Sequence, residues 1–445
     1  MMRSEIFHYT LHDKKKLNVQ AVCFDSFDEL NYLKPDFDPS SFERLCDLYR
    51  DFIIPKYSRV FGTLVHFYLP EGMGVPFTDE DGEYGKIFDQ TVLCNILFQK
   101  HASLKDGEIV FDDERVKTLF ESLKEKGCLR IAKGKRKKLS FLPVGKNSGL
   151  LSRNMTQAKL KVNANFFLMD FFDLGSVYDQ VFTPFGLSVR DGKILQPPLF
   201  DREVLIIRDG TVSVEHIPLS QIEVIIDGVS YKDNENACFC SRPQQQRSKE
   251  GGFDIVVIGD RVVAYKEGGN CQIPSSGFLI HLNESVWIKD TSVTYRGLED
   301  ISFALQVGNS AVKDGKMTEK FESPFYNFLH FRDVSYPPSM YPLNYRKDRA
   351  PRIILGADQS GRPMLLWFEG AAKFGHDPSK DSVGASLSEC AQIAQELGMY
   401  NGIHLDGGGS AQILLNGKRE LMISDRNKDD LSENERAVPM ALYVL

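Results

Sequence analysis

Three consecutive glycines stand between an aspartate and a serine in the stretch Asp406-Gly407-Gly408-Gly409-Ser410. Successive glycine amides can converge on one concavity, called a nest, which binds anionic oxygens. The Ser410 hydroxyl can add another donor, and Asp406 at the rim can carry a proton or orient a water molecule. This combination favours recognition of a phosphate group beside the bond that is being cut.

The plainer alternative is a tight turn, or a bulge packed against another backbone, with Asp406 as a turn cap. Three related motifs are excluded by spacing. A P-loop requires a lysine directly after its last glycine, and no lysine follows these glycines. The nucleophile motif G-x-S-x-G fails at Gln412. A dinucleotide fingerprint must open a helix, whereas this loop opens a strand.

The segments around the glycines predict the elements that position them. Residues 384–398 have apolar side chains at helical spacing and a capping box formed by Ser386 and Glu389. Strands are predicted over 400–405 and 411–415. The glycine corner is therefore a connection between two strands, fed by a short helix.

Residues 160–370 contain short runs that alternate between apolar and polar side chains, which is typical of antiparallel strands. Turn pairs of aspartate and glycine between such runs predict hairpins. Hairpin turns are expected at Asp191-Gly192, Asp209-Gly210, Gly259-Asp260 and Asp358 to Gly361, and Asn416-Gly417 is expected to begin a return strand.

The first 160 residues carry weaker signals. They predict strands over 17–25 and 59–69, helices over 41–53 and 113–127, and a loop over 133–154. We expect an α+β fold of largely antiparallel sheets with packed helices and an additional N-terminal α/β region. The expected domains are 1–160, of unknown role, and 161–445. Residues 1–160 can cover the site, mediate assembly or supply strands for exposed sheet edges.

The composition is that of a globular protein, with 445 residues, 42% of them hydrophobic and 26% charged. A net charge of −7 spread along the chain gives no reason to expect a nucleic-acid partner, and the basic run 133–138 is expected to be a solvated loop. No run of 18 apolar residues predicts a membrane span. The start does not resemble a secretion signal, so a cytoplasmic location is expected.

The cysteines are expected to be reduced thiols. Cys238 and Cys240 form a C-x-C pair, with Cys271 further along the chain. A metal site there needs a fourth ligand at a recognisable spacing, and the sequence offers none. We therefore expect no metal and no cofactor.

The stretch 384–410, which ends in L-D-G-G-G-S, resembles the signature of the phosphodiester glycosidase family. Further stretches that resemble family motifs follow in the same order. They are "VNANFF" (162–167), "CQIPSSGFLIHL" (271–282), "RAPRIILGAD" (349–358) and "ERAVPMALYVL" (435–445), where an arginine precedes the closing strand. The resemblance covers about 160–445.

This resemblance implies an enzyme that hydrolyses a sugar-1-phosphodiester to free sugar and a phosphomonoester. It implies that Arg352 binds the phosphate, because a guanidinium fork matches two phosphate oxygens. Asn163 is expected to hold a sugar hydroxyl or a phosphate oxygen. The amides of the corner and Ser410 are expected to complete the substrate-binding set, which comprises Asn163, Arg352, Gly407, Gly408, Gly409 and Ser410.

The expected catalytic residues are Asp406 and Glu369, two carboxylates that can divide the acid and base roles. His404 shares a strand face with Asp406, although a histidine satisfied within the fold is the more ordinary interpretation. Departures from the family pattern include Ala164 and Asn165 in place of two glycines.

Two alternatives remain open. One is a non-catalytic module that binds phosphorylated glycans or nucleotide sugars, and the other is a metal-assisted phosphodiesterase with Asp406 as a ligand. The expected partner is a small-molecule or glycan phosphodiester, and self-association into a homo-oligomer stays open.

Overall fold

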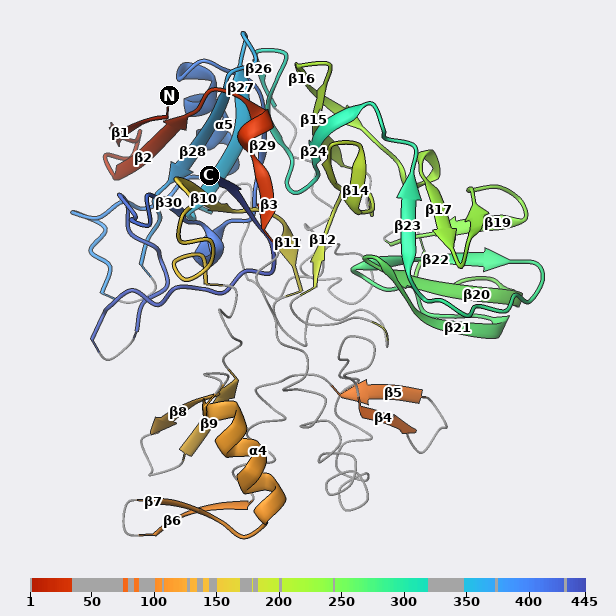
Figure 1. Ribbon diagram of the computed structural model, residues 1–445. Helices are drawn as coiled ribbons and strands as arrows, with labels where there is room; N and C mark the ends of the chain where they lie inside the picture. The colour runs from red at the N-terminus through yellow and green to blue at the C-terminus, as the bar shows by residue number, and fades with distance from the viewer. Residues whose placement is uncertain are drawn as a thin grey trace.

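The structure is a computed structural model of the chain (Figure 1). It describes residues 2–33, 75–78, 84–87, 101–105, 108–125, 129–133, 139–143, 150–168, 178, 183–199, 202–242, 245–318, 348–372, 375–427 and 430–445. The predicted helix at 41–53 and the predicted strand at 59–69 lie outside these ranges, as do residues 134–138 of the basic run.

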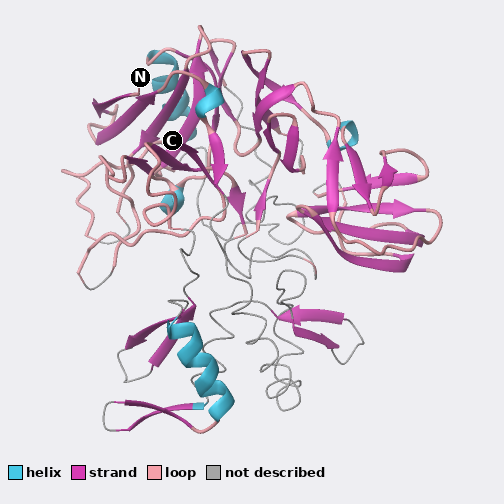
Figure 2. Cartoon of the chain, in the orientation of Figure 1, coloured by secondary structure: helices cyan, strands magenta, loops and turns pink. Residues whose placement is uncertain are grey.

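The predicted α+β class is wrong. The described residues form mainly antiparallel β-sheets, and only two α-helices occur among them, α4 (Glu114–Glu125) and α5 (Leu387–Glu396). Figure 2 shows how far the strands outnumber the helices. Alternating apolar side chains dominate the sequence because most strands bury one face or both, so helical periodicity is confined to short stretches.

The largest sheet has seven strands in the order β1-β2-β28-β27-β29-β25-β26. Their bounds are β1 (Arg3–Thr10), β2 (Lys16–Cys23), β28 (Pro363–Phe368), β27 (Arg352–Asp358), β29 (Met399–His404), β25 (Ser310–Lys313) and β26 (Lys316–Met317). Helix α5 covers one face, where Cys390 and Ala394 share a core with Ile354 and Leu366. The predicted capping box of α5 is confirmed.

A four-stranded sheet draws on distant parts of the chain, in the order β3-β31-β10-β30. These strands are β3 (Asn31–Leu33), β31 (Ala441–Val444), β10 (Leu160–Asn163) and β30 (Ile413–Leu415). Its apolar side chains pack against the face of the seven-stranded sheet that lies opposite α5. The same core also includes one face of a five-stranded sheet, which is described next. This core includes Val162, Leu205, Ile353, Ile403 and Leu442.

Three further sheets, here called the middle sheets, are built from residues 188–305. The five-stranded one has β14 (Lys193–Gln196), β13 (Ser188–Arg190), β24 (Ile301–Leu305), β15 (Glu203–Arg208) and β16 (Thr211–His216). The three-stranded one has β18 (Val229–Tyr231), β17 (Glu223–Ile226) and β23 (Val293–Arg296). The four-stranded one has β19 (Ala237–Cys240), β22 (Gly277–Leu282), β20 (Glu250–Ile258) and β21 (Arg261–Gly269). A second apolar core joins all three.

The remaining strands form four hairpins. They are β11 (Phe166–Phe167) with β12 (Pro184–Phe185), β4 (Val75–Thr78) with β5 (Tyr84–Ile87), β6 (Ala102–Lys105) with β7 (Glu108–Phe111), and β8 (Leu129–Lys133) with β9 (Leu139–Pro143). The predicted helix at 113–127 is confirmed as α4. The loop predicted over 133–154 is wrong in part, because β9 lies within it and pairs with β8.

The predicted hairpins are confirmed. Strands β13–β14, β15–β16, β20–β21 and β27–β28 pair as expected, and Asp191 and Asp209 adopt positive φ beside their glycines. The return strand predicted after Asn416 is wrong. In place of a strand, the turn is closed by an isolated bridge between Leu415 before it and Lys418 after it.

The N-terminal strands complete sheets built from the C-terminal part of the chain. Strand β2 pairs with β28 and β3 pairs with β31, and Figure 1 shows the red strands β1 and β2 beside the blue strand β28. Residues 3–33 therefore supply strands to sheet edges, one of the three roles expected for residues 1–160. The domain boundary at 160 stays a prediction. Among the described helices, none has the length and apolar character needed to cross a membrane.

Candidate active site

Three of the predicted site residues lie at one end of the seven-stranded sheet. Glu369 follows the last residue of β28, Arg352 is the first residue of β27, and Asp406 comes two residues after β29 ends. These strands are neighbours in the order β28-β27-β29. Strands lie about 4.8 Å apart, so the backbones at Glu369 and Asp406 are about 10 Å apart, with Arg352 between them.

The glycine corner is a short 3-10 turn, Gly408–Ser410. The Gly407 amide donates to the Oδ1 atom of Asp406 over 2.9 Å. The Gly408 amide donates to the carbonyl of Pro351 over 2.9 Å, and the Ser410 amide to the carbonyl of Gly407 over 3.2 Å. Three of the four amides are therefore used within the fold. They do not converge on an open anion nest, contrary to the sequence prediction.

Asn163 fastens this corner to β10. Its Nδ2 atom donates to the carbonyl of Asp406 over 2.6 Å, and its Oδ1 atom accepts from the amide of Gln412 over 3.1 Å. The Asp406 amide in turn donates to the carbonyl of Ala164 over 3.0 Å. Asn163 thus sets the position of Asp406, and direct contact with a substrate stays a prediction for it.

Gly409 faces an ion pair that the sequence prediction missed. Arg436 donates to the Oδ2 atom of Asp425 from Nη2 over 2.8 Å and from Nε over 3.0 Å. A Cβ atom on Gly409 would overlap both partners of this pair. The glycine is therefore required by the close approach of a guanidinium. In sequence, Arg436 appeared only as the arginine before the closing strand of the family motif.

The carboxyl group of Asp406 lies in the field of two guanidinium groups. Burial raises the pKa of Asp406 to about 6, and the Ser410 hydroxyl, Arg436, the Gly407 amide and Arg352 each oppose that rise. A Cβ atom on Gly407 would lie 3.7 Å from Nη1 of Arg352. The corner thus brings one titratable carboxyl within electrostatic reach of both Arg352 and Arg436.

Arg352 is itself buried, and its Nε atom lies 3.4 Å from the carbonyl of Ala385, just before α5. His404, the last residue of β29, pairs with Ile354 on β27. Ile354 is two residues from Arg352, so the side chains of His404 and Arg352 lie on the same face of the sheet. Burial and the nearby Arg352 lower the pKa of His404 to about 3, so its imidazole is neutral at physiological pH. A neutral histidine adds no charge beside the guanidinium that it neighbours.

Both carboxylate oxygens of Glu369 accept hydrogen bonds within the fold. Oε1 accepts from the amide of Met422 over 2.9 Å, and Oε2 accepts from Nδ2 of Asn18 over 2.6 Å. Asn18 belongs to β2, and its own Oδ1 atom lies 2.8 Å from Nδ1 of His8 on β1. Glu369 therefore ties the N-terminal strands to the sheet end. A catalytic role for it stays a prediction.

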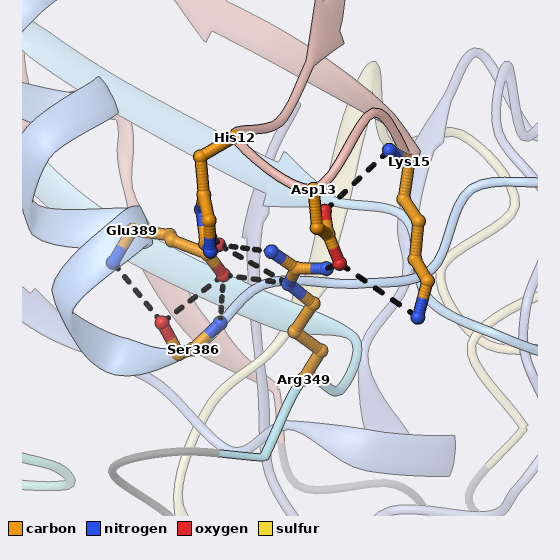
Figure 3. Close-up of polar contacts among 6 residues, drawn as sticks. All are labelled: His12, Asp13, Lys15, Arg349, Ser386 and Glu389. Carbon is orange, nitrogen blue, oxygen red and sulfur yellow. Dashed lines mark hydrogen bonds and ion pairs between the residues drawn. The ribbon is translucent and has the colours of Figure 1, made fainter.

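An ion network holds the start of β27 in place (Figure 3). Arg349 donates from Nη2 to Glu389 over 2.6 Å and from Nη1 to Asp13 over 2.7 Å. These carboxylates raise the pKa of Arg349, and Arg349 helps to lower the pKa of Asp13 to about 2. Glu389 also closes the capping box with Ser386. The network joins the β1–β2 turn, the approach to Arg352 and the start of α5.

Comparison with known families matches residues 220–445 to the model of the phosphodiester glycosidase domain. That match spans half of the chain and includes Arg352, Glu369, Asp406 and Arg436. The chain belongs to the phosphodiester glycosidase family. Membership confirms the resemblance drawn from the sequence. The residues that bind and react with substrate stay predictions.

Three solved structures resemble this phosphodiester glycosidase family member at low identity. A hypothetical protein from Synechocystis is 14% identical with a TM-score of 0.43, and the alignment covers all of this chain and 62% of that one. The zebrafish N-acetylglucosamine-1-phosphodiester alpha-N-acetylglucosaminidase catalytic domain, auto-inhibited by its pro-peptide, is 10% identical with a TM-score of 0.40, with 100% and 82% covered. A protein from Burkholderia pseudomallei is 14% identical with a TM-score of 0.41, with 100% and 96% covered. No curated protein matches the sequence.

Proposed function

We propose that the protein hydrolyses a glycosyl phosphodiester to a free sugar and a phosphomonoester. The observation that supports this most directly is that the Asp406 carboxyl lies within electrostatic reach of two guanidinium groups, Arg352 and Arg436, which flank the glycine corner. A phosphodiester carries one negative charge, and arginine forks match its oxygens. Two fixed guanidinium groups beside one titratable carboxyl suit such a substrate.

In this proposal Asp406 acts as the general base for the attacking water. A pKa of about 6 lies close to neutral pH, where a base is both ionised and able to take a proton. The Gly407 amide holds one carboxylate oxygen of Asp406, and Asn163 holds its backbone carbonyl. The carboxylate therefore keeps a fixed direction. The arginines stabilise the charge that gathers on the phosphate oxygens.

The test is release of reducing sugar from a panel of hexose-1-phosphate methyl diesters by the full chain. Asp406→Asn is expected to lower kcat by about 10²–10⁴-fold, the usual contribution of a positioned base. Asp358→Asn is the matched control, because Asp358 caps the turn at the other end of β27 and should leave turnover unchanged.

The activity of the wild-type protein is expected to rise as pH increases through about 6, as Asp406 loses its proton. Equal turnover by Asp406→Asn and wild type would remove Asp406 from the mechanism. Tight binding of the diesters with no turnover anywhere on the panel would favour the non-catalytic binding module instead.

A further inference from the structure

The C-x-C pair lies far from the candidate active site in the chain and has no part in the proposed hydrolysis. Both cysteines belong to β19, and side chains two residues apart on a strand point to the same face. The Sγ atoms of Cys238 and Cys240 are 3.9 Å apart. Among the described residues, no three His, Cys, Asp or Glu side chains are grouped so that they could hold a metal ion.

We propose that Cys238 and Cys240 form a reversible dithiol–disulfide pair that is oxidised by small-molecule disulfides. The two thiols are already neighbours, with their sulfurs 3.9 Å apart on one face of the strand. Cys271 packs in the same apolar cluster as Cys240, and its Sγ atom lies 3.1 Å from the hydroxyl of Tyr178.

The strand geometry predicts that this disulfide is strained. Two residues of strand rise about 6.7 Å, which lies at the upper end of the roughly 4.4–6.8 Å Cα separation that disulfides usually span. Strand β19 stands at the edge of its sheet and pairs there only with β22, so it can pucker to shorten that separation. Strained disulfides are more easily reduced and serve as labile rather than structural bonds.

The different exposure of the two cysteines predicts which one reacts first with the small disulfide. Cys238 is partly exposed, whereas Cys240 is buried, and burial raises the pKa of Cys240 to about 12. The Cys238 thiolate attacks one sulfur of the small disulfide, whose S–S bond breaks and releases one thiolate. Cys240 then loses its proton to solvent and attacks Sγ of Cys238, which releases the second thiolate. Two protein thiols are oxidised and one disulfide is reduced to two thiols.

The test equilibrates the full-length, reduced protein with oxidised and reduced glutathione at a series of ratios. Remaining thiols are alkylated, and peptides are mapped by mass spectrometry. The peptide that holds Cys238 and Cys240 is expected to lose two hydrogens as the buffer becomes more oxidising. In the reduced protein, alkylation of Cys238 is expected to be roughly tenfold faster than that of Cys240, because only Cys238 is accessible.

Variants fix the order of the steps. Cys240→Ser is expected to accumulate one glutathione on Cys238, and Cys271→Ser is expected to keep the Cys238–Cys240 disulfide. Alkylation of both cysteines across the whole series in the wild-type protein would overturn the proposal, as would a disulfide from either cysteine to a different one. The wild-type protein alone decides between these outcomes, so the proposal can be tested even if a variant fails to fold.

Discussion

Two buried aspartate environments show what distinguishes the sheet end from the middle sheets. Asp254 on β20 is fully buried, yet its Oδ1 atom lies 2.7 Å from Nδ1 of His281 and its Oδ2 atom accepts from the Ser248 hydroxyl. Asp406 lies in the field of two arginines, and its pKa is raised to about 6 because the effect of burial outweighs the lowering by those arginines, the Ser410 hydroxyl and the Gly407 amide. Burial of an acid alone therefore does not mark a site. What distinguishes Asp406 is that its carboxyl lies near two guanidinium groups and has a pKa close to neutral pH.

The largest expected contrast comes from two glycines with close neighbours. A Cβ atom on Gly409 would overlap the Arg436–Asp425 pair, and one on Gly277 of β22 would overlap the carbonyl of Val257. Overpacking costs about 1–3 kcal/mol, so both Gly409→Ala and Gly277→Ala should lower the free energy of unfolding, measured in urea. Only Gly409→Ala should also lower kcat/KM, by about tenfold or more, because it displaces a guanidinium whose charged hydrogen bonds contribute about 1.5–3 kcal/mol each.

Equal specific activities of the folded Gly409→Ala and Gly277→Ala proteins would break this comparison. In that case the space around Gly409 would matter for folding alone, as it does around Gly277.

A smaller contrast is expected between two arginines that each contact two carboxylates. Arg349→Gln is expected to lower the free energy of unfolding by about 2 kcal/mol, because its side chain is only 16% exposed and its hydrogen bonds are charged. Arg208→Gln in the middle sheets is the control. Its side chain is 33% exposed beside the more exposed Asp300 and Glu215, so a loss below about 1 kcal/mol is expected. Urea titrations of both variants check this, and equal losses would contradict it.

The last contrast is a difference in how the free energy of unfolding changes between pH 4 and 6. Folding raises the pKa of Asp406 from 3.8 to about 6, so the stability that its proton provides is complete below pH 3.8 and is lost as pH rises through 6. Folding lowers the pKa of His404 from 6.5 to about 3, so its contribution is complete above pH 6.5 and is lost on acidification. The two slopes oppose each other in the wild-type protein.

Asp406→Asn removes only the first of these slopes. On acidification from pH 6 to 4, the variant is expected to lose about 1.4 kcal/mol per pH unit more than wild type. At pH 7 it is expected to be more stable than wild type, by up to about 3 kcal/mol. Urea unfolding across this range measures both quantities. Parallel stability curves would show that Asp406 titrates normally in the folded protein.

Local patterns predicted the local structure well. The aspartate–glycine hairpins and the Ser386–Glu389 capping box depend on neighbours in sequence, and they are confirmed. The family resemblance singled out Arg352 and Asp406, which the structure places at one end of the seven-stranded sheet, while their roles toward a substrate stay predictions. The fold class was wrong because helical periodicity in a few segments was given too much weight against the many strands.

The contacts that sequence could not predict join distant parts of the chain. Nothing near Gly408 indicates that its amide will donate to Pro351, so the nest was a reasonable but wrong expectation from the glycines alone. Asn18 likewise meets Glu369 only because β2 pairs with β28. Arg436 and Asp425 are only 11 residues apart, but no local pattern indicates that their ion pair will pack against Gly409.

The position of β31 between β3 and β10 has a consequence for biosynthesis. A ribosome releases β3 and β10 long before it makes β31, so both strands wait with an unpaired edge. Closure of this sheet, and with it the final seating of Asn163 beside the corner, must therefore wait until β31 has been made, more than 400 residues after β3. Such late, long-range pairing slows folding and leaves strand edges open to wrong pairing in the meantime.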